Sequence, residues 1–145
     1  MLLLDTNVVS ELRKINTPRV NPNVALWQSR VPATDLYISV ITLMEIEVGI
    51  LRLARNDAIQ AAILRGWLEN RVLPEFARRT LPVDQAVAYR CARLHIPNPK
   101  PDRDALIAAT ALVHGMSIVT RNGSDFHDLG VTVVNPWARE QGELQ

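Results

Sequence analysis

Leu2-Leu3-Leu4-Asp5-Thr6-Asn7 opens the chain directly after Met1, and this stretch decides the fold. A short apolar run that ends at an acidic residue is typical of a buried strand in a parallel sheet. Asp5 or Thr6 can cap a helix that we predict from Val8 to Arg13. A strand followed at once by a helix predicts an α/β unit at the start of the chain.

The remaining sequence repeats this alternation of strands and helices. We predict further strands at 36–40, 117–120 and 131–134, and either a short strand or a bare connection at 80–83. Helical spacing predicts a short helix capped by Asn23 and longer helices at 41–51, 58–76, 86–94 and 102–114. The predicted fold class is therefore α/β, with a central, mainly parallel sheet and helices on both faces.

Length and composition favour one ordinary globular domain. The chain has 145 residues, of which 48% are hydrophobic and 21% charged, and its net charge is +1. That charge neither favours nor excludes a nucleic-acid partner. One cysteine, Cys91, and the absence of an export or membrane-spanning segment predict a cytoplasmic protein. We predict a domain over residues 1–137 and a short charged tail over residues 138–145.

Four acidic residues follow predicted strands or begin predicted helices. Asp5 ends the first strand, Glu45 and Asp104 lie early in helices, and Asp125 follows the strand at 117–120. Ligands of parallel α/β sheets bind at the carboxyl ends of the strands. We therefore expect these four acids, distant in sequence, to converge at one edge of the sheet.

Clustered carboxylates are typical of a site for Mg²⁺ or Mn²⁺, because these ions prefer oxygen ligands. The three histidines lack metal-ligand spacing, which makes Zn²⁺ a poorer candidate. Each acid also has a purely structural interpretation, as a helix cap, a solvated residue or a partner of the helix dipole. We expect Asp84 to be such a cap, and Glu47 to be solvated because it points about 200° away from Glu45 around the helix.

Four segments resemble, in order, the motifs of the PIN-domain family. They are Leu2–Glu11, Ser39–Glu45 with Gly49 four residues later, Asp104–Ala111, and Thr120–Asn122 with Asp125-Phe126. The ending Val134-Asn135-Pro136-Trp137 is similar to the FitB branch of VapC-type toxins. The resemblance spans almost the whole chain and implies the PIN-domain fold.

The resemblance also implies a Mg²⁺- or Mn²⁺-dependent endoribonuclease that is the toxin of a toxin–antitoxin pair. Its acidic site carries over to Asp5, Glu45, Asp104 and Asp125, with polar helpers at Thr6, Asn7 and Thr120. Some relatives place an acid where this chain has Asn122, so Asn122 and Asp125 both remain candidates for the fourth position. The resemblance further implies an RNA substrate, a homodimer, and a small antitoxin that blocks the site and binds operator DNA.

Arg13, Lys14 and Arg121 lie near the acids in sequence and are candidates for RNA contacts or for ordinary solvated charges.

Two other functions compete with this interpretation. A catalytically silent PIN-fold module that binds RNA or a partner would have lost acids, and none is lost here. An aspartate-nucleophile phosphatase would need a second acid at position 7, where this chain has Asn7.

Overall fold

A five-stranded parallel sheet forms the centre of the protein in the computed structural model, which describes residues 1–139. The strand order is β3-β2-β1-β4-β5, and every pair is parallel. The strands are β1 (Leu2–Leu4), β2 (Leu36–Ser39), β3 (Thr80–Leu81), β4 (Ser117–Val119) and β5 (Val133–Val134). The predicted fold class is confirmed, and residues 80–81 form a strand rather than a bare connection.

Successive leucines of β1 pack on opposite faces of the sheet, as the two-residue period of a strand requires. Leu4 packs into a core formed with α1, α3 and α4, whereas Leu3 packs into a second core formed with α7. Both leucines are fully buried. The continuous apolar run at 2–4 therefore reflects a strand that is covered on both sides.

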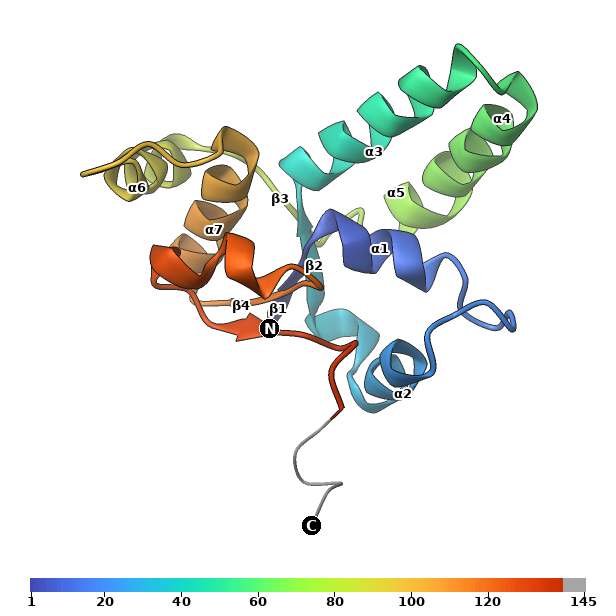
Figure 1. The fold of residues 1–145 in the computed structure, drawn as a ribbon, viewed down its shortest axis with the longest axis horizontal. Helices are drawn as coiled ribbons and strands as arrows, with labels where there is room; N and C mark the ends of the chain where they lie inside the picture. The colour runs from blue at the N-terminus through green and yellow to red at the C-terminus, as the bar shows by residue number, and fades with distance from the viewer. Residues whose placement is uncertain (140–145) are drawn as a thin grey trace.

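Within residues 1–139, seven α-helices surround the sheet (Figure 1). In this view α6 and α7 lie on one side, while α3 and α4 form a long hairpin on the other. The helices are α1 (Thr6–Leu12), α2 (Pro22–Arg30), α3 (Val40–Ala54), α4 (Ala58–Trp67), α5 (Leu73–Glu75), α6 (Gln85–Leu94) and α7 (Asp102–His114). No helix within residues 1–139 is both long and apolar enough to span a bilayer.

Several helices begin one or two residues before their predicted starts, including α1 at Thr6 instead of Val8, and side-chain caps explain the differences at α2 and α3. Asn21, not Asn23, caps α2, because its side chain accepts hydrogen bonds from the amides of Asn23 and Val24. Val40 belongs to α3 rather than β2, because the Ser39 hydroxyl accepts from the Ile41 amide and starts the helix one residue early.

The predicted helix over 58–76 is interrupted. After α4 the chain widens into a π-helical stretch, Leu68–Val72, before the short α5. Pro74 lacks the amide N–H that a regular helix would bond to Asn70, so the regular helical bonding pattern cannot continue unchanged through this residue. Asp84 and Gly115 behave as predicted: Asp84 caps α6 through the Val87 amide, and Gly115 ends α7 at a φ of 66°.

The predicted charged tail falls mostly outside the structural description. Residues 140–145 lie beyond the described range, which includes Ala138 and Arg139. Trp137, at the predicted end of the domain, is half-buried against the core that contains Leu4. Cys91 is buried against α7 as a core residue, as its helical position indicated.

Candidate active site

Asp5 is a buried carboxylate at the carboxyl end of β1, held by three donors. Its backbone amide bonds to Val119 of β4 at 2.9 Å. Its carboxylate accepts from the Thr6 amide and the Thr120 hydroxyl, both at 2.8 Å, and from Asn7 at 3.3 Å. Burial nevertheless raises the pKa of Asp5, although the bonds from Thr120 and Thr6 oppose that rise. Asp5 as a whole residue is only 8% exposed.

Glu45 reaches the same edge from the second turn of α3. Its Oε1 accepts from the Thr6 hydroxyl at 2.7 Å, which links α3 to the start of α1. Asn7 links the start of α1 to the loop after β4. Its side-chain NH₂ group donates to the Thr120 hydroxyl at 3.3 Å, and its side-chain oxygen accepts from the Arg121 backbone amide at 3.1 Å. Thr6, Asn7 and Thr120 thus hold the acidic residues in place.

Asp104 completes the cluster from the first turn of α7. The residues three, four and seven positions later, Ile107, Ala108 and Ala111, are fully buried, so this helix face points at the sheet as predicted. Burial, together with the negative charges of Asp125, Asp5 and Glu45, raises the pKa of Asp104 to about 6. The four predicted acids therefore lie within electrostatic range of one another.

The loop after β4 brings Asp125 near the other acids. The charge of Asp125 acts on both Asp5 and Asp104. Asn122 contributes its backbone amide, which donates to the Thr120 hydroxyl at 3.0 Å. Asp125 thus lies within electrostatic range of Asp5 and Asp104, the backbone of Asn122 supports the position of Thr120, and both residues remain candidates for the fourth position.

The donor set is chemically suited to a hard divalent cation. All four groups are carboxylates, and a cation among them would offset the repulsion that raises the Asp104 pKa. Within residues 1–139, however, no three His, Cys, Asp or Glu side chains are close enough to grip one ion directly. A hard divalent cation at these carboxylates would be held in part through the waters that such an ion usually keeps.

An open groove of about 540 Å³ adjoins the acids. Thr6, Asn7 and Glu45 lie at its end next to the acidic cluster, and Arg13, Lys14 and Arg121 supply positive charge along it. The guanidinium of Arg121 stacks on the Trp137 ring, 5.4 Å from its centroid. The predicted basic contacts are thus brought to the same groove as the acids.

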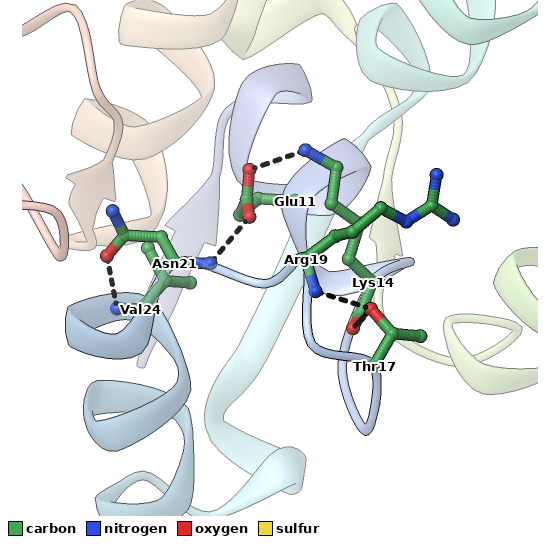
Figure 2. Close-up of polar contacts among 6 residues, drawn as sticks. All are labelled: Glu11, Lys14, Thr17, Arg19, Asn21 and Val24. Atoms are coloured by element: carbon green, nitrogen blue, oxygen red, sulfur yellow. Dashed lines mark hydrogen bonds and ion pairs between the residues drawn. The ribbon is translucent and has the colours of Figure 1, made fainter.

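Glu11 fixes the rim of this groove (Figure 2). Its carboxylate accepts from the Lys14 ammonium at 3.3 Å and from the Asn21 amide at 2.9 Å. These bonds tie the loop between α1 and α2 to the end of α1, and with the charges of Lys14 and Arg121 they lower the pKa of Glu11 despite its partial burial. Lys14 is consequently held at the groove instead of moving freely in solvent.

Sequence reasoning missed Arg103. Its guanidinium lies 3.8 Å from the second carboxylate oxygen of Glu45, so a cation already stands beside the acidic cluster. The sequence signal that could have identified Arg103 was its position next to the predicted site residue Asp104.

Glu47 also differs from its prediction. It lies on the surface away from the acids, but it pairs with both terminal nitrogens of Arg65 and is not simply solvated.

Comparison with known proteins identifies the family of this chain. The family model for the PIN domain matches residues 2–131. The toxin FitB of Neisseria gonorrhoeae is 35% identical over 142 residues, covering 94% of this chain and 99% of the relative. The VapC ribonuclease Y4jK of Sinorhizobium fredii is 34% identical over 142 residues, covering 94% and 98%.

A solved structure of FitAB bound to an IR36 DNA fragment superposes with a TM-score of 0.84 at 35% identity, covering 97% of this chain and 99% of that one. The family model, the sequence relatives and the solved structure all indicate the same family. The chain therefore belongs to the PIN-domain family, in the branch that contains the FitB and VapC toxins.

Proposed function

We propose that this protein is a metal-dependent endoribonuclease and the toxin of a toxin–antitoxin pair. The observation that carries the proposal is the convergence of Asp5, Glu45, Asp104 and Asp125 beside a groove with a basic rim. The printed names of the relatives, a toxin and a ribonuclease, support the same function. We propose the cytoplasm as its site of action.

The four acids are the proposed metal-binding and catalytic residues. A bound Mg²⁺ or Mn²⁺ supplies an activated water and offsets charge on the scissile phosphate. Asp5 and Glu45 are pre-oriented by Thr120 and Thr6, so their oxygens need little rearrangement. Asp104 must lose its proton to serve as a ligand, and Arg121 binds the flanking phosphate. We expect 5′-phosphate and 3′-hydroxyl ends.

Incubation of the purified protein with total host RNA tests this function. We expect discrete fragments with Mg²⁺ or Mn²⁺, none with EDTA, and 5′-phosphates at the new ends. A preparation of Asp104→Asn, purified in parallel, controls for contaminating nucleases. Equal cleavage by the wild type and by Asp104→Asn would show that the assigned residues do not form the catalytic site. RNA binding with no cutting under any metal condition would favour the silent binding module.

The partner that we propose is a small antitoxin that covers the acidic site and binds operator DNA. Solved relatives with this fold include FitAB bound to a DNA fragment and a toxin–antitoxin complex from Klebsiella pneumoniae, the latter at 27% identity and a TM-score of 0.65. Co-expression with a candidate small antitoxin from the same genome tests this partnership. Copurification, together with lost RNA cleavage, is the expected result.

Arg103 should weaken metal binding in the free enzyme. Its guanidinium, 3.8 Å from Glu45, competes with an incoming cation for the same carboxylate. Replacing Arg103 with Ala should therefore tighten Mn²⁺ binding by about three- to tenfold, the size expected for one partly solvated charge near an ion. Isothermal titration with Mn²⁺ measures this change. Arg93→Ala, on the exposed part of α6, is the matched control and should leave the affinity unchanged.

The homodimer is also a proposal, and α3 offers a surface for it. Val40, Met44 and Leu51 are spaced to share one face of the helix, and they are 36%, 41% and 55% exposed. Exposed apolar side chains in such a row favour association. Light scattering should give a dimer mass for the wild type and a monomer mass for Leu51→Glu. A monomeric wild type at micromolar concentration would contradict the dimer.

A further inference from the structure

Asp104 and Asp125 are carried by two separate segments of the chain. Asp104 lies in the first turn of α7, a helix that begins without a side-chain cap. Asp125 lies in the first of two 3₁₀ turns after β4, η3 (Gly123–Asp125) and η4 (His127–Leu129). The negative charge of Asp125 contributes to the raised pKa of Asp104, so the two carboxylates repel each other. Contacts between the two segments must therefore oppose this repulsion before a cation binds.

Apolar contacts hold the two turns from their inner side. Phe126 and Leu129 are buried in the same core as Ile107 of α7, and Figure 1 shows this part of the chain lying beside that helix. Asp125 and Asp128 are both exposed on the outer side of the turns. The core thus fixes the turns to the sheet, and the placement of the outer side depends on polar contacts.

Lys100 makes such a contact from the loop that leads into α7. Its Nζ lies 3.9 Å from Oδ2 of Asp128 in η4. The other oxygen of Asp128, Oδ1, lies 2.9 Å from Nε2 of His127. Nδ1 of the same ring lies 3.0 Å from the carbonyl oxygen of Ser124, the residue before Asp125. A continuous series of contacts therefore joins Lys100 to the turn that carries Asp125.

Lys100 is itself fixed to the end of α6. Its backbone amide donates to Nδ1 of His95 at 3.0 Å, and His95 is the C-cap of that helix. Three prolines restrict the backbone of the intervening loop and of its junction with α7, because proline fixes φ. The Lys100 side chain is only 28% exposed, so it has less freedom than an ordinary surface lysine. Lys100 is therefore a fixed point from which the turns after β4 can be held.

We infer that Lys100 is a positioning residue for the metal site, which holds the turn carrying Asp125 in place through its pairing with Asp128. This inference rests on the proposed metal-dependent function. With the pair intact, Asp104 and Asp125 stay close enough to act on the same cation. Without it, their repulsion moves the outer side of the turns away from α7, and a cation that binds there must draw the carboxylates together again.

Lys100→Gln tests the inference, because charge and positioning predict opposite changes in Mn²⁺ affinity. The substitution removes a positive charge near the acids, which by itself would tighten Mn²⁺ binding, as we expect for Arg103→Ala. If Lys100 positions Asp125, Mn²⁺ should instead bind about threefold more weakly, the size expected for one partly exposed ion pair. Isothermal titration measures the affinity without RNA or catalysis. The backbone amide that His95 accepts is unchanged.

Two further variants complete the test. Exchanging the charges, with Lys100→Asp and Asp128→Lys in one protein, keeps the net charge and reforms an ion pair. Its Mn²⁺ affinity should return to within about twofold of the wild type. Lys14→Gln is the matched control, because it removes the only other lysine of the chain, on the groove side of the acids. It should not weaken Mn²⁺ binding.

The outcomes separate this inference from the proposed function. Equal or tighter Mn²⁺ binding by Lys100→Gln would overturn the positioning role of Lys100 and leave the nuclease in place. Weaker binding that the charge exchange does not restore would also overturn it, because the loss would then not depend on the pair with Asp128. A wild-type protein that binds no Mn²⁺ would overturn both the inference and the metal-dependent function.

Discussion

Asp104→Asn should abolish metal-dependent RNA cleavage, with a loss of about 1000-fold or more, while the protein remains folded. The substitution keeps the size of the side chain but removes the charge that attracts the cation and offsets its hydration. Losses of this size are common when a group that stabilises transition-state charge is removed. Single-turnover cleavage of a labelled RNA fragment measures the loss, and circular dichroism checks the fold.

The same substitution should stabilise the metal-free protein near neutral pH. The folded-state pKa of Asp104 is raised from 3.8 to about 6, so the folded protein binds this proton more tightly than the unfolded chain does. The contribution of this group to stability consequently falls as the pH rises from about 4 to about 6, and it remains unfavourable above that range. In Asp104→Asn this contribution is absent at every pH.

Thermal melts in EDTA at pH 5 and pH 7 test the sign of this contribution of Asp104 to stability. Relative to the wild type, Asp104→Asn should gain more in melting temperature at pH 7 than at pH 5. Asp102→Asn is the control, because Asp102 lies in the same first turn of α7 but is 90% exposed at its side chain. A wild-type protein more stable than Asp104→Asn at pH 7 without metal would contradict the proposed repulsion.

Asp5→Asn should also abolish cleavage, but it should destabilise the fold as well. All three groups around the Asp5 carboxylate are donors: the Thr6 amide, the Thr120 hydroxyl and the Asn7 amide. An asparagine has one acceptor oxygen and an NH₂ group, which would face at least one of these donors. A buried, mismatched polar contact costs about 1–3 kcal/mol.

Urea unfolding in EDTA measures this cost, and Thr120→Val provides the comparison. Thr120→Val removes one donor to Asp5 while leaving its charge in place, so we expect a smaller loss of activity than for Asp5→Asn. It should also raise the Asp5 pKa further, because the bond from Thr120 lowers it. An Asp5→Asn protein that keeps wild-type cleavage would remove Asp5 from the catalytic site.

Much of the fold could be predicted because its determinants are local. The apolar run at Leu2–Leu4, the Asp84 cap and the Gly115 terminus each encode their structure within a few residues. The convergence of the acids could be predicted for a different reason: in a parallel sheet the strand ends meet at one edge whatever their separation in sequence.

Features that depend on contacts between distant residues could not be predicted. The approach of Arg103 to Glu45 and the pairing of Glu47 with Arg65 require the relative placement of two helices, which no local pattern specifies. The choice of Asn21 over Asn23 as the cap of α2 was decided partly by Glu11, which accepts from the Asn21 amide and fixes where the loop ends.

The central position of β1 has a consequence for the synthesis of the protein. β1 is made first but pairs with both β2 and β4, and Asp5 depends on Val119 and Thr120. A nascent chain that ends before β4 has Asp5, Glu45 and Asp104, yet lacks the strand that aligns the first of them. A translation product shorter than about 120 residues therefore lacks the contacts that align Asp5, and we expect RNA cleavage to appear only when translation is nearly complete.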